Sequence, residues 1–289
     1  MKVVKELPIS LFKSLQLLSI PKKRLVKPVK EKVPVIISLT SIPSRLNTLH
    51  LVVRSLLVQD VAAEKIVLWL NTDLKETIPS ALKKLISTRF EIRYSELNCS
   101  HRKLIHSLEL FPDHVIVTCD DDLMYRKNWL STIYKEHQKQ PEKIIGNHTV
   151  HIQHDDTGQP IPFKKWKYPQ SKKVNPWATT PIGAWGVLYP PNSVHKQVLD
   201  ENLFMQLAPK ADDLWFKAMA LLQGTQSVQA SQTPKEPIPI IGTQKVALKN
   251  ENLGQDKNTV QWNALENHFN LSDIILKTEN IDRRNQQLQ

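Results

Sequence analysis

Apolar and polar positions alternate in a regular way between residues 33 and 138. Nearly unbroken apolar runs, typical of strands covered on both faces, occur at 33–40, 65–70, 90–94 and 115–118. Segments with helical periodicity lie between or after them, at about 46–57, 76–87, 103–110 and 127–138. This alternation predicts an α/β fold with a mostly parallel, doubly wound sheet and helices on both faces.

The pattern changes on either side of this region. After about Lys143 we expect one strand over 143–152, a loop over 159–178, a strand rich in Gly and Trp, and a helix from Asp212. The sequence beyond residue 230 is irregular and rich in Gln and Asn. We therefore predict one main domain at 33–230, between a distinct N-terminal segment, 1–32, and an irregular C-terminal segment, 231–289.

The N-terminal segment combines an amphipathic pattern with a basic stretch at 21–30. Its apolar and polar residues lie on opposite helical faces: Leu11, Phe12, Leu15 and Leu18 against Ser10, Lys13 and Ser14. An amphipathic helix with a cationic tether suits a membrane surface that carries acidic lipids. The alternative is a helix packed on the domain and followed by a solvated charge run. No apolar run approaches the roughly 20 residues needed to span a bilayer.

Composition narrows the functional classes. The chain has 39 Lys and Arg against 28 Asp and Glu, a net charge of +11 that implies an anionic partner such as nucleic acid, acidic lipid or a phosphorylated substrate. Its 40% apolar residues exclude wholesale disorder. Two cysteines cannot build a disulfide framework, which indicates a reducing compartment, the cytoplasm.

Three adjacent carboxylates, Asp120, Asp121 and Asp122, directly follow an apolar strand. They repel one another, and a divalent cation would relieve the repulsion; Asp oxygens suit Mg²⁺ or Mn²⁺. In an extended segment Asp120 and Asp122 point the same way and can face one ion, whereas Asp121 faces a sugar hydroxyl or a base. The alternative is a solvated turn in which one Asp caps the next helix.

Two further features carry chemistry. Asp212 and Asp213 open an apolar helix, where they either interact with the helix dipole or provide a general base beside a pocket. Gly183 and Gly186 bracket Trp185, which either stacks on a sugar ring or lies in the core. His148, His151 and His154 would alternate between the two faces of one strand, so we do not expect them to converge on a metal. Cys99 and Cys119 are interpreted as spectator thiols.

In this order the motifs resemble the GT-A (Rossmann-like) glycosyltransferases that use nucleotide sugars, of the bacterial surface-polysaccharide type (lipopolysaccharide or capsule). The resemblance covers about Val33 to Gln223 and rests on the segments 40–45, 102–105, 120–129, 183–186 and 212–215.

The resemblance implies a role for each matching residue. It places Thr40, Ser41, Arg45, Asn71, Lys103, Asp120 and Asp121 in the donor site, with Asn71 at the base or ribose and Lys103 at the diphosphate. It implies that Asp120 and Asp122 hold Mn²⁺ or Mg²⁺, and that Trp185 and Gly186 contact the sugar or acceptor. Asp213 would be the catalytic base; Asp212 stays an alternative, because many relatives have Glu-Asp here. His268 is the one histidine after Asp213 that can complete the metal site.

The expected reaction transfers a sugar from a nucleotide sugar, a UDP-sugar first, to a glycan or lipid-linked glycan with inversion. The enzyme would lie in the cytoplasm, peripherally on the inner face of the membrane. A cation and basic side chains stabilise the leaving diphosphate, and a carboxylate takes the proton of the acceptor hydroxyl.

Two other functional classes share some of these features. A nucleotidyltransferase, or another metal-dependent phosphoryl-transfer enzyme, also needs acidic metal ligands, but the phosphate-loop motif GxxxxGK[ST] is absent. A basic nucleic-acid-binding protein is the second. The lysines are scattered or concentrated in 1–32 and no recognition motif is present, so no nucleic-acid partner is expected.

Overall fold

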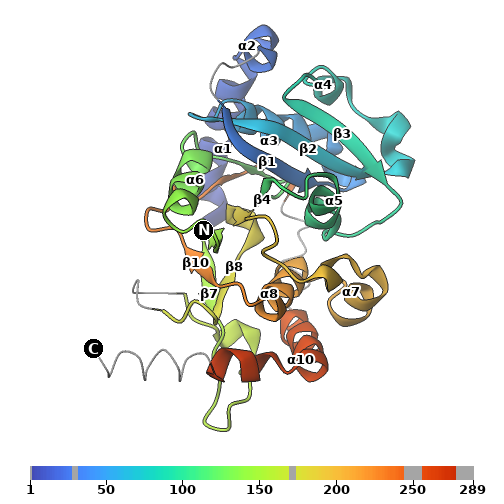
Figure 1. Ribbon diagram of the computed structural model, residues 1–289. Helices are drawn as coiled ribbons and strands as arrows, with labels where there is room; N and C mark the ends of the chain where they lie inside the picture. Colours follow the sequence, from blue (N-terminus) through green and yellow to red (C-terminus); the bar gives the residue numbers. More distant parts are fainter. Residues whose placement is uncertain (1, 28–31, 169–173, 244–255, 278–289) are drawn as a thin grey trace.

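A seven-stranded sheet forms the centre of the computed structural model, which describes residues 2–27, 32–168, 174–243 and 256–277 (Figure 1). The strand order is β10-β6-β9-β4-β1-β2-β3, and only β9 runs antiparallel to its neighbours. The strands are β1 (Lys32–Thr40), β2 (Ala62–Asn71), β3 (Phe90–Ser95), β4 (Val115–Thr118), β6 (Ile144–Gly146), β9 (Val187–Tyr189) and β10 (Ser227–Gln229). The predicted mostly parallel sheet is confirmed.

Helices cover both faces of this sheet, also as predicted. Val35, Ile37 and Leu39 of β1 pack in one apolar cluster with α3 (Leu46–Leu57), α4 (Ser80–Lys83) and α6 (Trp129–Lys139). Ile36 points to the opposite face, as the alternation of a strand requires. A second cluster on that face contains α5 (Arg102–Leu110), α7 (Glu201–Leu207), α8 (Asp212–Gln223) and α10 (Lys257–Phe269).

The prediction of one helix over 76–87 is wrong, because the helical structure here is shorter and divided. The chain forms a 3-10 helix, η2 (Thr72–Thr77), and then the single helical turn of α4. Pro79 lies between them in an extended conformation. Proline has no amide N–H and disfavours helical backbone at the residue before it, so Pro79 favours a break between the two helical segments.

The strand predicted over 143–152 divides in two. β6 belongs to the central sheet, whereas β7 (Thr149–His151) pairs with β8 (Thr179–Pro181) in a separate two-stranded sheet. The division follows Gly146, where an added Cβ would lie 3.0 Å from Pro181 Cβ. Gly183–Trp185 forms a 3-10 helix, η4, and β9 begins only at Val187, so the Gly/Trp segment is a turn before a strand.

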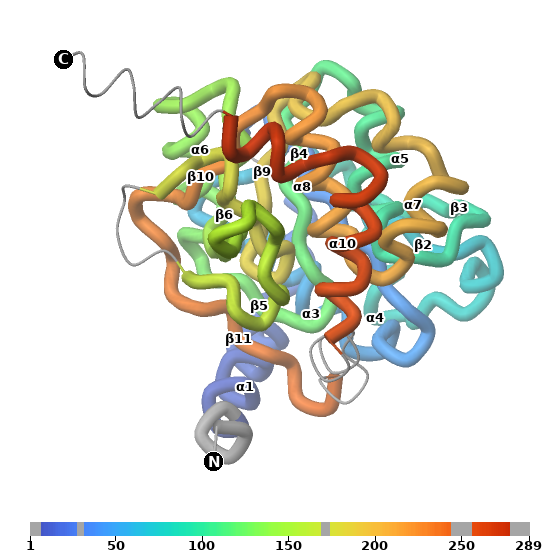
Figure 2. Tube along the Cα trace, turned by 90° about the horizontal axis from the view of Figure 1, so that it is seen from below, coloured from blue at the N-terminus to red at the C-terminus, as the bar shows by residue number. Residues whose placement is uncertain are grey.

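The C-terminal segment is irregular only in part: residues 231–237 form no helix or strand, whereas the described residues after 256 are mostly helical. Residues 257–269 form α10, and residues 271–277 are also helical (Figure 2). Trp262 and Leu265 of α10 are buried against α8. Most of the other side chains of α10 are polar, and for this reason the amphipathic pattern is weak in the sequence.

The N-terminal segment is helical, with α1 (Lys2–Leu18) and α2 (Lys22–Val26). α1 packs on α3, beside which it lies in Figure 1, and on β11 (Ile238–Pro239), beside which it lies in Figure 2. β11 pairs antiparallel with β5 (Leu123–Met124). Among the residues that the structure describes, no helix has the length and apolar character to cross a membrane.

The carboxyl ends of the parallel strands define the edge that carries the chemical side chains. β1, β2 and β4 end there at Thr40, Asn71 and Thr118. Because β9 runs in the opposite direction, the segment before it, Gly183–Gly186, lies at the same edge. Ligands of open α/β sheets bind at this edge.

Candidate active site at the carboxyl edge of the sheet

The acidic triplet follows β4 after one residue, Cys119, and its first member is fixed to the Gly183–Gly186 segment. The amide N–H of Asp120 donates to the hydroxyl of Tyr125 at 2.8 Å, and that hydroxyl donates to the carbonyl of Ala184 at 3.1 Å. The side chains of Asp121 and Asp122 are buried, whereas that of Asp120 is 33% exposed. Asp120 is therefore the member of the triplet that a ligand reaches first.

Arg45 neutralises part of the triplet. Its guanidinium contacts Asp121 and reaches Asp122 Oδ2 at 3.0 Å. Ser41 donates its hydroxyl to Asp121 Oδ2 at 2.5 Å. Burial opposes the charge of Arg45, but the carboxylates of Asp121 and Asp122 raise its pKa above the ordinary value. Ser41 and Arg45 therefore lie beside the triplet with their polar groups on its carboxylates, and their contacts with a nucleotide stay predictions.

Lys103 connects the triplet to the second acidic pair. Its ammonium lies 3.1 Å from Asp120 Oδ1 and 2.9 Å from Asp212 Oδ2. The first turn of α5 carries Lys103, and the first turn of α8 carries Asp212. Burial opposes the charge, yet Asp120, Asp212 and Asp213 raise the pKa of Lys103 well above its ordinary value. Lys103 is thus a buried cation that joins acids from two distant segments.

The two carboxylates of the second pair differ in their surroundings. Asp212 faces Lys103 and also accepts a hydrogen bond from the Ser100 hydroxyl at 2.8 Å. Burial alone would raise its pKa, but the charge of Lys103 holds the pKa of Asp212 below its ordinary value. Asp213 accepts the amide N–H of Gly183 at 2.9 Å. Burial and then the charge of Asp212 raise the pKa of Asp213 to about 7.

A carboxyl group with this pKa is suited to proton transfer near neutral pH. Asp212 stays ionised beside Lys103, and Asp213 gains and loses its proton near pH 7. The two carboxyl groups therefore differ in their surroundings and in their pKa, and which of them acts as a base stays a prediction.

The site carries an excess of negative charge. Five carboxylates, those of Asp120 to Asp122 and of Asp212 and Asp213, lie near three cations, Lys103, Arg45 and Arg102, so two negative charges stay uncompensated when all five carboxylates are ionised. Burial and then the charge of Asp120 raise the pKa of Asp122 to about 7, so this carboxyl also resists ionisation. An additional cation would relieve this repulsion.

The donor set for such a cation is limited. Among the described side chains, no group of three or more His, Cys, Asp or Glu is arranged to hold a metal ion. Asp120 and Asp122 offer carboxylate oxygens, and Mg²⁺ is usually bound by one or two carboxylates together with substrate phosphates. These residues therefore fit a cation shared with a phosphate ligand, and they do not form an all-protein metal cage.

Thr40 and Asn71 lie at the ends of β1 and β2 and bond to the protein. The Thr40 hydroxyl donates to the carbonyl of Trp69 at 2.9 Å and accepts from Arg102. Asn71 donates to the carbonyl of Glu96 at 3.1 Å, and its side-chain oxygen accepts the Asp73 amide at 3.0 Å. Both side chains hold the ends of strands in place, and their contacts with a nucleotide remain predictions.

Trp185 and Gly186 are held by Trp129. The indole N–H of Trp129 donates to the carbonyl of Trp185 at 2.6 Å. Gly186 has φ of +96°, and an added Cβ would lie 2.5 Å from the Trp129 ring, so packing alone requires glycine here. The Trp185 ring stacks on His148 at 4.7 Å, and His148 stacks on Tyr168 at 4.9 Å. The sequence did not predict this aromatic row.

Three other histidines, His151, His154 and His268, each have a different partner. The ring of His151 bonds to the carbonyl of Asn175 at 3.1 Å, and that of His154 bonds to the Ser272 hydroxyl at 3.0 Å. His268 packs on Phe269 at the end of α10.

Sequence reasoning missed Ser100, Tyr125 and the backbone of Gly183 as parts of the site. Ser100 carries no signal in the sequence, because its partner Asp212 is 112 residues away. Tyr125 follows the triplet and Gly183 opens the glycine segment, but their hydrogen bonds depend on the assembled sheet edge.

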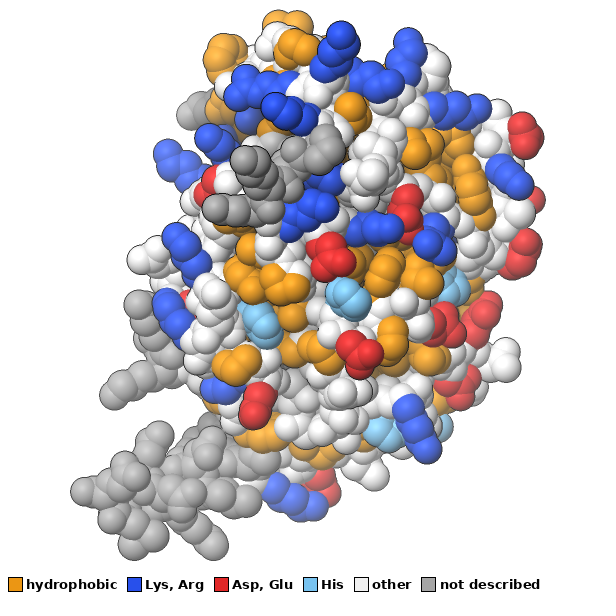
Figure 3. Space-filling model, turned by 45° about the horizontal axis from the view of Figure 1, so that its top comes forward, with side chains coloured by type: hydrophobic (Ala, Val, Ile, Leu, Met, Phe, Trp, Pro, Cys, Tyr) orange, Lys and Arg blue, Asp and Glu red, His pale blue; other side chains and the backbone are white. Residues whose placement is uncertain are grey.

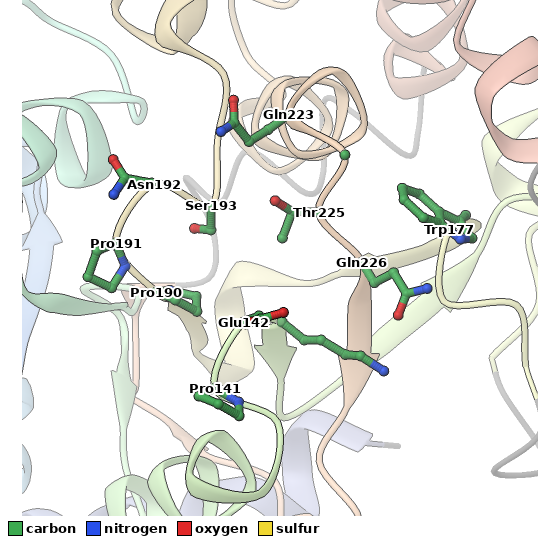
Figure 4. Close-up of a pocket in the computed structure, with 12 residues that line it drawn as sticks. Pro141, Glu142, Trp177, Pro190, Pro191, Asn192, Ser193, Gln223, Thr225 and Gln226 are labelled. Atoms are coloured by element: carbon green, nitrogen blue, oxygen red, sulfur yellow. The ribbon is translucent and has the colours of Figure 1, made fainter.

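A hollow of about 520 Å³ lies elsewhere, where β6 and β10 begin and β9 ends (Figure 4). Its lining comes from residues 141–143, 177, 190–193 and 223–226. Since β4, β6 and β10 run in one direction, this hollow is at the edge of the sheet opposite the carboxylates. Its lining has only Glu142 and Lys143 as charged residues.

Comparisons with known proteins identify no family. No protein-family model matches the chain, and no curated protein matches it. Similar solved structures include a 4-diphosphocytidyl-2C-methyl-D-erythritol synthase from Anaerococcus prevotii, at 14% identity and a TM-score of 0.45, which covers 78% of this chain and 96% of that one.

Two other structures are similarly distant. TarS of S. aureus in complex with UDP has 12% identity and a TM-score of 0.44 over 70% of this chain and 59% of the TarS chain. A CMP:2-keto-3-deoxy-manno-octonic acid synthetase complexed with CTP has 14% identity and a TM-score of 0.39 over 78% of this chain and 99% of that chain. Likenesses at this distance assign no activity to the chain.

Proposed function

We propose that this chain is a metal-dependent GT-A glycosyltransferase that uses a nucleotide sugar and acts in the synthesis of a surface polysaccharide. One observation carries the proposal. Lys103 joins Asp120 of the triplet to Asp212 of the α8 pair, and the adjacent Asp213 has a pKa of about 7. This arrangement supports a cation site and a general base at one edge of the sheet.

The donor side of the proposal rests on charge. A nucleoside diphosphate is anionic, and a site with two excess negative charges would repel it without an added cation. Asp120 and Asp122 would hold Mn²⁺ or Mg²⁺, which supplies a Lewis acid for the leaving diphosphate. Lys103 and Arg45 contact the carboxylates and not open space, so their role is to fix the acidic side chains and to lend positive charge to the phosphates.

The acceptor side rests on Asp213. The acceptor hydroxyl oxygen forms a bond to the anomeric carbon, the bond from that carbon to the diphosphate oxygen breaks, and the hydroxyl proton passes to the Asp213 carboxylate. A single base that activates the acceptor gives direct displacement and inversion at the anomeric carbon. The Gly183 amide orients this carboxylate from one side.

The general base favours glycosyl transfer over nucleotidyl transfer to a phosphate. A phosphate nucleophile is already ionised at neutral pH, whereas a sugar hydroxyl has a pKa far above 7 and needs a base. Asp213 provides such a group. The donor that we propose to test first is a UDP-sugar, and the acceptor is a glycan or a lipid-linked glycan.

An assay of donor use tests this function. Purified protein with Mn²⁺ is incubated with UDP-, GDP-, CDP- or dTDP-sugars, or with nucleoside triphosphates, and the released products are measured. We expect nucleoside diphosphate release from one sugar nucleotide, loss of release in Asp213→Asn, and normal release in Asp156→Asn, whose carboxylate lies in an exposed loop. Pyrophosphate release from a nucleoside triphosphate would instead identify a nucleotidyltransferase.

A further inference from the structure

The helix α1 turns apolar side chains toward solvent. Leu7, Leu11, Leu15 and Leu18 recur at helical spacing on one face, and Phe12 lies beside them. Their side chains are 48% to 70% exposed. Together with Ile9 they are six of the thirteen exposed large apolar side chains found in the described part of the chain. We call Leu7, Leu11, Phe12, Leu15 and Leu18 the α1 stripe.

The opposite face of α1 is fixed to the protein. Ser10 is buried and donates its hydroxyl to the carbonyl of Pro239 at 2.7 Å, and Leu17 is buried in the main cluster. Arg54 donates to the carbonyls of Leu17 and Ile20 at 2.8 and 3.0 Å. A helix that only stabilises a domain turns its leucines inward. Because α1 turns only one of its described leucines, Leu17, inward together with Ser10, the α1 stripe is left for another apolar surface.

The charge of the residues around the α1 stripe indicates which kind of surface the stripe contacts. Between Leu7 and Lys27 the chain has five basic residues, Lys13, Lys22, Lys23, Arg24 and Lys27, and no acidic one. All but Lys13 are exposed on or beside α2, which Leu25 anchors in the core. Figure 3 shows Lys and Arg side chains gathered over the end of the molecule that carries α2 in Figure 1.

We propose that the α1 stripe and the basic residues of α2 dock the protein on a bilayer that contains anionic lipids. An amphipathic helix binds such a surface with its apolar face among the acyl chains, and each nearby Lys or Arg adds attraction to acidic headgroups. A second copy of the chain fits less well, because it would bring two basic segments together.

The docking surface lies close to the proposed active site. The ladder of β5 and β11 begins directly after the triplet, and the Ile240 amide donates to the carbonyl of Asp122 at 2.9 Å. α1 packs on this ladder, and Ser14 contacts the Met124 sulfur at 3.7 Å. Docking would therefore bring the carboxylates near the lipid surface, where an acceptor attached to a lipid is found. The docking itself does not depend on the proposed function.

Vesicle binding by the full chain tests the proposal. We would measure cosedimentation with vesicles of phosphatidylcholine alone and of phosphatidylcholine mixed with phosphatidylglycerol. The unmodified protein should bind the anionic vesicles at least about tenfold more tightly, since each basic residue near the surface contributes about 1 kcal/mol. Binding should weaken as salt is added.

Two variants and a control separate the contributions. Phe12→Glu with Leu15→Glu should abolish binding, and Lys22→Gln with Lys23→Gln and Arg24→Gln should reduce it at least about tenfold. Val260→Glu changes an equally exposed apolar residue on α10 and should bind as the unmodified protein does. Circular dichroism melts check that each variant folds.

Three results would overturn the proposal: no binding to anionic vesicles, equal binding by the Phe12 and Leu15 variant, or a dimer in light scattering that this variant dissociates. None of these readings requires catalysis, so they are independent of the activity assay.

Discussion

At the scale of single residues, the site depends on a difference between two neighbouring carboxylates. Asp212 contacts Lys103 and has a lowered pKa, whereas Asp213 contacts only a backbone amide among the hydrogen bonds described and has a pKa of about 7. The ionised neighbour is itself one cause of the raised pKa of Asp213. On the proposed function, Asp212 is the positioning residue and Asp213 is the base.

Replacing Asp213 should remove catalysis and increase stability. Asp213→Asn should lower turnover by about 10²- to 10⁴-fold, the usual contribution of a general base, with unchanged nucleotide affinity. The folded pKa of Asp213 is above the unfolded value, so its ionisation costs stability as pH rises from about 4 through about 7. The variant should thus melt at a higher temperature than the unmodified protein at pH 8, with little difference near pH 4.

Asp212→Asn should have the opposite effect on stability from Asp213→Asn. It leaves Lys103 with Asp120 as its described ion-pair partner, so we expect a loss of about 2 kcal/mol at neutral pH. Equal melting temperatures for the two variants at pH 8 would contradict the division of roles.

Gly183 should tolerate no side chain, although its conformation is ordinary. An added Cβ would lie 2.7 Å from Asp213 Oδ1 and 3.2 Å from Lys103 Nζ. Displacing the base carboxylate should lower turnover in Gly183→Ala by about 10²-fold. Gly224→Ala is the control, because Gly224 has open space around it but φ of +77° at the end of α8. That variant should lose stability and keep its turnover, and the reverse pattern would refute the role of Gly183.

The candidate site could be predicted only as residue types in order along the chain. The triplet after β4 and the acidic pair opening α8 are visible in the sequence because several adjacent carboxylates are costly without a function. Their partners are not visible. Arg45 and Asp121 are 76 residues apart, and Lys103 can meet both Asp120 and Asp212 only after β4 and α8 have packed. The sequence therefore suggested phosphate contacts for two cations that the structure pairs with carboxylates.

At the scale of elements, α8 carries a second unusual group besides its two aspartates. Lys217 is buried in the middle of the helix, and its ammonium has no hydrogen-bond partner among the described residues. Burial lowers the pKa of Lys217 to about 7. The proposed function does not use this lysine, so we treat it as a cost in stability.

Replacing this lysine should stabilise the protein. Lys217 has a folded pKa below its unfolded value of 10.5, so the unfolded chain binds the extra proton between about pH 7 and pH 10 and stability rises with pH there. Lys217→Met removes the buried charge and should raise the unfolding free energy by a few kcal/mol near pH 7. Thermal melts from pH 6 to pH 9 should show a smaller pH dependence in the variant. An unchanged or lower melting temperature would show that the ammonium has a partner.

Helices and strands could be predicted where the local sequence alone determines the conformation of the segment. The four apolar strands at 33–40, 65–70, 90–94 and 115–118 are present because such runs are stable only between two layers. The failures occur where distant packing decides. Residues 143–152 divide where Thr149–His151 pairs with the distant strand Thr179–Pro181 in a separate sheet, and α10 buries two apolar side chains, Trp262 and Leu265, on α8.

At the scale of the whole molecule, the charge distribution separates two regions. The chain is basic overall, with a net charge of +11, whereas the proposed active site is acidic and, on the proposed function, needs a bound cation to hold an anion. The basic residues at 13–27 instead accompany the α1 stripe. Composition alone would suggest that the excess of basic residues marks the nucleotide site. The proposed nucleotide site is instead acidic, so the net charge does not locate it.

Activity should depend on pH through the two carboxyl groups with a pKa of about 7. Asp122 must be ionised to bind the cation, and Asp213 must be ionised to accept a proton, so turnover should rise between about pH 6 and pH 8. Lys103 keeps its charge throughout, because its pKa is raised. At saturating Mn²⁺ the cation site is filled throughout this pH range, so the remaining pH dependence of turnover reports the ionisation of Asp213. A rate independent of pH in this range would exclude Asp213 as the base.

Calorimetric titration of UDP, GDP, CDP and dTDP into the protein tests the central claim most directly. The titration is made with Mn²⁺ and with a chelator, for the unmodified chain, for Asp122→Asn and for the exposed control Asp156→Asn. The account predicts that at least one nucleotide binds only with Mn²⁺, that Asp122→Asn abolishes this binding, and that Asp156→Asn retains it. Binding that needs neither Mn²⁺ nor Asp122, or no binding of any of these nucleotides, would contradict a cation-dependent diphosphate site at the end of β4.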